Sequence, residues 1–280
     1  MNVGPERTAY VEGIGFWAPQ LPGWELARRV FAGKAVAPAT PAPRPAPALL
    51  PPNERRRAPD TVAISMEAGS QACAQAGCDP AELACVFAST HGDLAITDYM
   101  CETLAKTPTL ISPTRFHNSV HNAAAGYWTI ATGCMAPYTA ISAHRYTFAQ
   151  GLLEALAQVH SDQRRVLYVA YDIAARGPLA AMAPSDGLLA VALVLAPSAS
   201  AQSLASLDWR VNEQDSLPDP DTQATHARLL AGNAMAACLP LFESLAGAGS
   251  RTAYALGPQL SLALAVNGTA QANVAERAHG

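Results

Sequence analysis

Several short stretches of the chain are almost entirely apolar. Such stretches are typical of strands that are covered on both faces. They occupy residues 84–89, 165–170 and 188–195. Shorter apolar or alternating segments predict further strands at residues 8–16, 138–142, 207–211 and 259–266. The chain is therefore expected to contain a sheet with a well-covered centre.

Between these strands, apolar residues recur three and four positions apart and predict helices. The predicted helices cover residues 24–32, 60–76, 95–106, 121–132, 148–159 and 225–245. The helix at 60–76 has both ends marked, because Asp60 is a typical cap and Gly77 is a typical stop. Strands that alternate with helices predict an α/β fold with a mostly parallel sheet and helices on its faces.

The chain shows no internal repeat, and we expect residues 1–280 to form a single domain. Residues 36–52 are mostly proline and alanine, which hold neither a helix nor a paired strand, and predict an extended surface excursion. The arginine run at 55–57 fits a solvated loop and an anchoring role equally well. Residues 267–280 are expected to form a flexible tail.

Composition narrows the class of protein. A chain of 280 residues that is 50% hydrophobic and 14% charged is not disordered. A formal net charge of −4 favours neither a nucleic acid nor an anionic membrane surface as partner. No uncharged apolar run reaches the roughly 20 residues that span a bilayer, and the first residues lack the pattern of a signal peptide. We therefore expect a cytoplasmic protein whose six cysteines stay reduced.

The densest polar cluster lies at residues 117–122. Its His117 and His121 are four residues apart and would share one face of a helix, as in half of a metal site. His91 or Asp93 would then supply a third ligand. Histidines that bond buried backbone groups are the commoner arrangement, so neither a metal nor a cofactor is predicted.

The cysteines give no clear nucleophile. No pair has the spacing of a zinc or redox motif, and Cys134 falls in a predicted turn without a marked base beside it. Cys73, Cys78 and Cys85 occupy apolar positions of a predicted helix and strand, where small core side chains are expected.

A series of short segments, taken in chain order, has the pattern of one known family. The segments are a proline- and arginine-containing stretch at 50–57, a strand and glycine turn at 86–92, the stretches 111–116 and 122–126, a strand at 165–172, and Asp186-Gly187 with the apolar run after it. Together they resemble the N-terminal part of the β-ketoacyl synthases, in the thiolase superfamily. The resemblance implies a thiolase-like layered fold with a mostly parallel central sheet, a complete N-terminal half and a shortened C-terminal half.

The chain differs from the β-ketoacyl synthases at the positions of their catalytic residues. The synthases carry a nucleophilic cysteine after Thr-Ala at a strand-to-helix turn, and matching Ser142-Ala143 to that pair puts His144 at the cysteine position. Their catalytic histidines belong to the C-terminal half, but neither His226 nor His279 has the family's neighbours. The resemblance therefore implies no catalytic residue here, with His144 at a degenerate nucleophile position.

Within the family, the chain resembles the chain length factors, also called ketosynthase β subunits, in the short form of aryl polyene-type pathways. Such a subunit is non-catalytic, pairs with an active ketosynthase and shapes the acyl channel in polyketide, aryl polyene-type or fatty-acid-like elongation. The implied partners are that ketosynthase, in a heterodimer, and an acyl carrier protein that contacts this chain directly or through the partner. The implied channel or interface residues are Phe116, His117, His121, Asn122, Gly126, Tyr127 and Trp128.

Two questions about this region stay open. The small residues at 123–126 fit close backbone approach across an interface and ordinary helix-on-sheet packing equally well. Tyr127 and Trp128 either line a tunnel or fill the core.

A stand-alone acyltransferase or hydrolase is the alternative function. His117, His121 and His144 lie in one motif region, and histidine is the commonest general base near neutral pH. This alternative predicts turnover of acyl thioesters by the purified chain alone, whereas a partner subunit predicts a complex with a ketosynthase.

Overall fold

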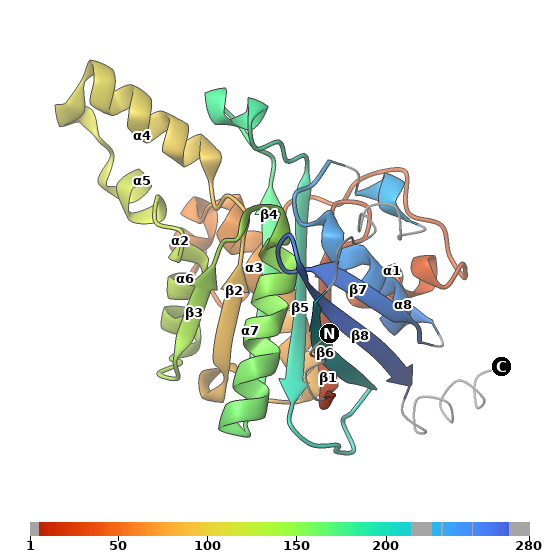
Figure 1. Ribbon diagram of the computed structural model, residues 1–280. Helices are drawn as coiled ribbons and strands as arrows, with labels where there is room; N and C mark the ends of the chain where they lie inside the picture. Colours follow the sequence, from red (N-terminus) through yellow and green to blue (C-terminus); the bar gives the residue numbers. More distant parts are fainter. Residues whose placement is uncertain (1–5, 214–225, 231, 248, 269–280) are drawn as a thin grey trace.

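The computed structural model describes residues 6–213, 226–230, 232–247 and 249–268. The strands are β1 (Arg7–Trp17), β2 (Ala84–Ala88), β3 (Tyr138–Ile141), β4 (Val166–Ile173), β5 (Leu188–Ala196), β6 (Ala205–Glu213), β7 (Arg251–Ala255) and β8 (Leu260–Gly268). They form one eight-stranded sheet in the order β3-β2-β4-β5-β1-β6-β8-β7 (Figure 1).

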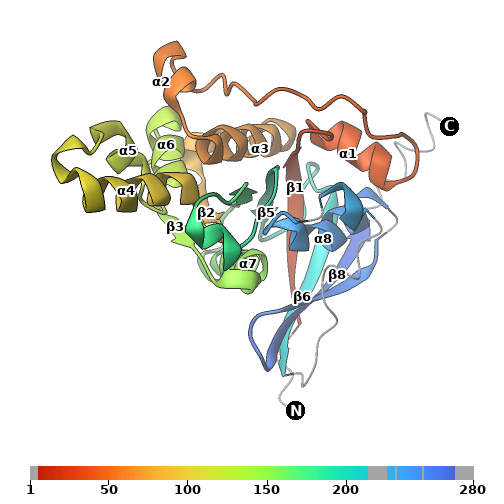
Figure 2. The same ribbon diagram turned by 90° about the horizontal axis from the view of Figure 1, so that it is seen from above.

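The helices lie on both faces of this sheet. They are α1 (Trp24–Phe31), α2 (Pro52–Arg57), α3 (Asp60–Ala76), α4 (Leu94–Lys106), α5 (Pro113–Asn118), α6 (Ala123–Thr132), α7 (Thr147–Asp162) and α8 (Leu239–Ala246). Seen from above, α3 and α6 lie on one side of the sheet and α7 and α8 on the other (Figure 2). The result is a layered α/β fold.

The expectation of a mostly parallel sheet is wrong. β2 runs parallel to β3 and to β4, whereas the other paired strands are antiparallel. Parallel neighbours need a long crossover, which α6 and α7 provide for the first three strands of the sheet. β4 and β5 are instead joined by residues 174–187, which contain one short 3₁₀ turn, so the chain reverses direction between them.

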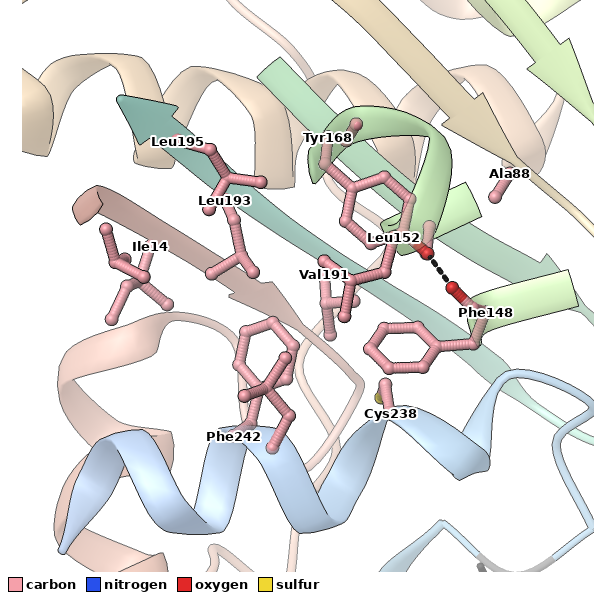
Figure 3. Close-up of a cluster of buried hydrophobic side chains, with 14 of the residues drawn as sticks. Ile14, Ala88, Phe148, Leu152, Tyr168, Val191, Leu193, Leu195, Cys238 and Phe242 are labelled. Atoms are coloured by element: carbon pink, nitrogen blue, oxygen red, sulfur yellow. Dashed lines mark hydrogen bonds between the residues drawn. The ribbon is translucent and has the colours of Figure 1, made fainter. Parts of the chain in front are cut away.

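The apolar run at 188–195 is strand β5, and both of its faces are buried as expected. Val191, Leu193 and Leu195 point toward the core beneath α7 and α8 (Figure 3). Ala190 and Val194 point to the other face, into the core beneath α3 and α6. Because side chains alternate along a strand, one uninterrupted apolar run supplies both cores.

Helix α3 packs closely on the sheet because β1 carries glycines where the helix crosses it. A Cβ atom at Gly13 would collide with the backbone oxygen of Ala72, and one at Gly15 would collide with that of Ala68. Helix α3 has the expected range and ends at Gly77, which is left-handed (φ 60°). Asp60 is its first helical residue rather than its cap, and its carboxylate instead accepts from Arg44 Nε at 2.5 Å.

Residues 36–51 run without a helix or strand along the edge of the molecule (Figure 2). Arg55 holds this segment, because its guanidinium donates to the backbone oxygens of Ala48 and Leu50 at 3.3 and 2.9 Å. Its neighbours Arg56 and Arg57 are exposed. Within the arginine run, Arg55 therefore has the anchoring role, whereas Arg56 and Arg57 are solvated.

The predicted helix at 225–245 is confirmed at residues 239–245 and wrong in the described residues before them. Residues 227–229 and 236–238 form 3₁₀ turns, and α8 begins at Leu239, with Pro240 in its first turn. Proline has no N–H and clashes with the preceding turn, so it fits the start of a helix and not its interior. Residues 225 and 231 lie outside the described residues.

Two other boundaries differ from expectation. The predicted helix at 121–132 begins at Ala123 and is preceded by α5. Residues 267 and 268, expected in a flexible tail, are the end of strand β8, while 269–280 lie outside the described residues. Strand β7 was missed, because a segment of 5 residues that mixes polar and apolar side chains has no strong pattern of its own. In the part of the chain that the structure describes, no helix is both long and apolar enough for a membrane span.

Candidate functional site

The turn between β3 and α7 has the geometry of a nucleophile elbow. It contains a 3₁₀ turn over His144–Tyr146, and His144 is left-handed with φ 51°. A non-glycine residue in this conformation is strained and is held there by its surroundings. Thr147 Oγ1 donates to the backbone oxygen of His144 at 2.6 Å and accepts from the Ala143 amide at 2.9 Å. A sharp strand-to-helix turn of this kind exposes the side chain at its apex, and His144 is exposed.

A second loop follows strand β2 and lies against this turn. The amide of Ser89 donates to the Ile141 oxygen at 3.1 Å, and Ser142 Oγ donates to the Thr90 oxygen at 2.9 Å. His121 Nε2 lies 2.8 Å from the Ser89 oxygen. The carboxyl ends of parallel strands meet at one edge of a sheet, and here they bring His121 and the His144 turn to the same loop.

Asp172, in β4, is the buried centre of this edge. Its carboxylate accepts from Ser89 Oγ at 2.8 Å and from the amides of Thr90 and His91 at 3.0 and 3.3 Å. Burial raises the pKa of Asp172 above its usual value, although the hydrogen bonds from Thr90 and Ser89 act in the opposite direction. The carboxylate thus fixes the shape of the loop after β2.

Asn233 ties the segment before α8 to this edge. Its Nδ2 donates to the backbone oxygens of Asp172 and Asp186 at 3.3 and 2.8 Å. The Asp186 amide in turn donates to the Gly232 oxygen at 2.8 Å. Sequence reasoning did not single out Asp172 or Asn233 as site residues. A polar residue inside the apolar strand pattern at 166–173 was the available signal for Asp172.

The residues expected at a channel or interface divide into two groups. Phe116 and Asn122 are exposed, and Asn122 Nδ2 donates to the Tyr138 hydroxyl at 2.9 Å. His117 is exposed and lies edge-on to Tyr127, with ring centroids 5.9 Å apart.

Trp128 belongs to the second group, because it is fully buried against Phe87 with ring centroids 6.3 Å apart. It fills the core beneath α3 and α6, which answers the question of tunnel or core for this side chain in favour of the core. Ala124 and Ala125 are buried in the same way, which corresponds to helix-on-sheet packing. At Gly126 an added Cβ would meet no atom within 4 Å, so this position faces open space.

The structure does not build the considered metal site. His117 and His121 do not share one helix face, since α5 ends at Asn118 and α6 begins after His121. Asp93 Oδ1 accepts from the Ile96 amide at 3.0 Å and caps α4. Among the residues that the structure describes, no three His, Cys, Asp or Glu side chains meet in a way that could hold a metal ion.

Cys134 lies outside this site. It is buried, and its Sγ is 3.2 Å from the Leu83 backbone oxygen, near the start of β2 and at the end of the sheet opposite His144. The thiol has no positioned role at the elbow.

A layered α/β fold with a strained strand-to-helix elbow defines the class as thiolase-like. The family model described as "Beta-ketoacyl synthase, N-terminal domain" matches residues 30–254. The chain belongs to this family. A search of curated proteins finds no significant match.

Solved structures of related fold cover nearly the whole chain. A ketosynthase (ApeO) in complex with its chain length factor (ApeC) from Xenorhabdus doucetiae aligns with a TM-score of 0.66 and 21% identity, over 94% of this chain and 98% of that one. The AntDE:AntF complex, a type II polyketide synthase acyl-carrier protein with its ketosynthase, aligns with a TM-score of 0.69 and 12% identity, over 95% and 100%. The ishigamide ketosynthase/chain length factor gives 0.61 and 14%, over 93% and 99%. At these identities the likeness concerns the fold.

Proposed function

We propose that this chain is a non-catalytic, chain-length-factor-like subunit that pairs with an active ketosynthase and shapes the channel for the growing acyl chain. The observation that carries the proposal is the strand-to-helix turn, where His144 has a left-handed backbone. By the resemblance to the synthases, this is the position of the family's nucleophilic cysteine. A thiolate attacks a thioester and becomes an acyl carrier of similar reactivity. An imidazole in the same place does not provide that exchange of thioesters.

The free edge of β3 supports a partner on this side of the molecule. β3 pairs with β2 and ends the sheet, so its outer backbone groups are open to another chain. Large exposed apolar side chains lie on β3 and on the segments of the chain between β2 and β3: Leu104, Leu110, Phe116, Val120, Ile130, Met135 and Tyr138. We call this set the β3 surface. Apolar surface beside an unpaired strand is typical of a protein–protein interface.

Helices α4 and α5 form an arm that extends past β3, away from the rest of the sheet (Figures 1 and 2). Only Leu94 and Thr103 of α4 are buried. The arm is held internally by Arg115, whose guanidinium carbon lies 4.1 Å from the centre of the Tyr99 ring. Since most helices owe their stability to a packed face, a partner that covers α4 completes the packing of this arm.

The names of the compared structures give the class of partner. One pairs a ketosynthase with its chain length factor, one is a ketosynthase/chain length factor, and one includes an acyl-carrier protein. By analogy we propose a ketosynthase heterodimer that works on acyl chains bound to a carrier protein, in polyketide, aryl polyene-type or fatty-acid-like elongation. We place this complex in the cytoplasm and assign residues 1–280 to one domain, with 36–52 as an excursion.

The stand-alone enzyme has less support from the geometry. His117 lies against Tyr127, and His121 Nε2 is engaged with a backbone oxygen. Only His144 stands exposed at the elbow apex. The three imidazoles therefore have separate surroundings. Among the residues that the structure describes, none of the three is hydrogen-bonded to a nucleophilic side chain, as acyl transfer needs.

Native mass spectrometry tests the proposal. The chain is co-expressed with a ketosynthase encoded beside its gene, purified and sprayed from a volatile buffer. A 1:1 complex is the expected result. A stable monomer or homodimer in the presence of the ketosynthase contradicts the proposal, and turnover of short and medium acyl thioesters by that isolated chain would establish the alternative.

A further inference from the structure

The C-terminal end of α3 brings two cysteines together. The Gly77 amide donates to the Ala74 oxygen at 3.3 Å, and the Cys78 amide donates to the Cys73 oxygen at 3.2 Å. With Gly77 left-handed, these two bonds form a Schellman motif. In this motif the side chains of the residues joined by the outer bond contact each other, and here both residues are cysteines.

The two thiols differ in accessibility. Cys73 is buried, while Cys78 is half-buried and its Sγ lies 3.7 Å from the backbone oxygen of Cys73. Cys78 is therefore the more accessible residue of the two. The direct backbone bond between the two residues keeps them within the short separation that a disulfide requires.

The two thiols also differ in pKa, and the more accessible one has the lower pKa. A hydrogen bond from the Cys73 thiol and the nearby Arg165 guanidinium lower the pKa of Cys78, against the effect of burial. The same hydrogen bond and burial raise the pKa of Cys73. Cys78 is thus the residue that forms a thiolate more readily, and the buried Cys73 keeps its proton.

We propose that Cys73 and Cys78 form a redox-active thiol pair that a low-molecular-weight disulfide, such as oxidised glutathione, converts to an intramolecular disulfide. The Cys78 thiolate attacks one glutathione sulfur, forms a mixed disulfide and expels one glutathione thiolate. The Cys73 thiol attacks the Cys78 sulfur, and its proton passes to the second glutathione, which leaves as a thiol. Two protein thiols are oxidised, and one small disulfide is reduced to two thiols.

This site is separate from the proposed partner surface. Residues 79–83 lead from Cys78 into the start of β2, whereas His144 follows the end of β3, which runs parallel to β2. The pair therefore lies at the opposite end of the sheet from the elbow. The inference does not depend on the proposed function.

The full chain is tested by peptide mapping. The reduced protein is incubated with oxidised glutathione, free thiols are alkylated, and the chain is cleaved before aspartate. Cleavage before Asp60 and Asp79 releases a peptide that carries Cys73 and Cys78 and no other cysteine. The expected peptide is lighter than the reduced one by two hydrogen atoms and carries no alkyl group. Cys101, an exposed and solitary thiol on α4, is expected to carry glutathione instead.

Variants separate the two steps. In Cys73→Ala, Cys78 should stop at the mixed glutathione disulfide, and in Cys78→Ala, Cys73 should stay reduced. Cys85→Ala removes another buried thiol and should leave the disulfide unchanged, which controls for loss of packing. Circular dichroism confirms that each variant is folded. A wild-type chain that keeps glutathione on Cys78, or that forms the disulfide only in denaturant, overturns the proposal.

Discussion

Ser142 donates its hydroxyl to the backbone oxygen of Thr90 at 2.9 Å and so joins the His144 turn to the loop after β2. The two loops are far apart in sequence and belong to neighbouring parallel strands. Through Thr90 the turn is also connected to the buried Asp172. Hydrogen bonds to the loop after β2 therefore hold the elbow in place, even though the elbow contains no cysteine.

The first prediction concerns His144 in elongation. If the subunit is non-catalytic, His144→Ala leaves the elongation rate of the ketosynthase complex within about twofold, because the imidazole then takes part in no transition state. The rate is measured as acyl transfer onto a carrier protein by the purified complex. Cys134→Ala, at a buried site away from the elbow, should behave in the same way. A fall of the His144→Ala rate to background contradicts the degenerate-site interpretation.

The left-handed backbone of His144 is also predicted to lower the free energy of unfolding of the chain. Its φ of 51° is in the left-handed region, which costs a side chain about 1–2 kcal/mol and a glycine much less. His144→Gly is therefore expected to raise the free energy of unfolding of the isolated chain relative to His144→Ala. Urea denaturation of both variants measures the difference. Equal free energies of unfolding for the two variants would contradict the prediction and show that the left-handed backbone at residue 144 costs no measurable stability.

The β3 surface is predicted to lose partner affinity when it is charged. Phe116 and Ile130 are 60% and 78% exposed, so Phe116→Glu and Ile130→Glu should leave the isolated chain stable. A glutamate pressed against an apolar partner surface is desolvated, and we expect affinity for the ketosynthase to fall about tenfold or more. Val36→Glu, at a 90% exposed apolar residue of the excursion, is the matched control. Titration calorimetry that finds all three variants equal to wild type would place the interface elsewhere.

Two glycines are predicted to respond in opposite directions to the same substitution. Gly15→Ala forces a Cβ into the backbone of Ala68 and should destabilise the chain by about 1–3 kcal/mol. Gly126→Ala adds a methyl group in open space on a helix, where alanine is favoured by up to about 1 kcal/mol. Thermal denaturation of the isolated chain checks both signs. Gly126→Ala weakens the ketosynthase complex only if the partner backbone approaches α6 at this position.

Asp172 is predicted to give the stability a dependence on pH. Its pKa is raised in the fold, so the folded chain binds the proton more tightly than the unfolded chain, whose carboxyl has a pKa of about 3.9. Its contribution is therefore fully present below that pH and is lost as pH rises through the folded pKa. The free energy of unfolding of wild type minus that of Asp172→Asn should fall across this range. Since burial also raises the pKa of Asp93, Asp93→Asn is compared in parallel.

Strands and helices with strong local patterns were predicted well. The run at 188–195 was predicted as a strand covered on both faces, because it offers apolar side chains to both of them, and the structure confirms it. The helix over residues 60–76 was recognised by its period and by Gly77. The prediction of one helix over residues 225–245 was wrong before Leu239, although Pro240 indicates that a helix starts there. The prediction that β5 is parallel to its neighbours was wrong because strand direction depends on the connections between strands, which periodicity does not describe.

The amino-acid sequence by itself determined the α/β class and the family pattern, because these depend on residue type and local order. The match of His144 to the nucleophile position stays a prediction of the sequence. Tertiary structure alone decided that Asp172 and Asn233 hold the loops of the elbow, that Trp128 fills the core, and that Cys73 meets Cys78. These relationships arise from strand order, burial and the backbone path at the end of a helix. The contacts of Asp172, Asn233 and Trp128 join residues whose spacing along the chain carries no information about their distance in space, whereas Cys73 and Cys78 meet because α3 ends at Gly77.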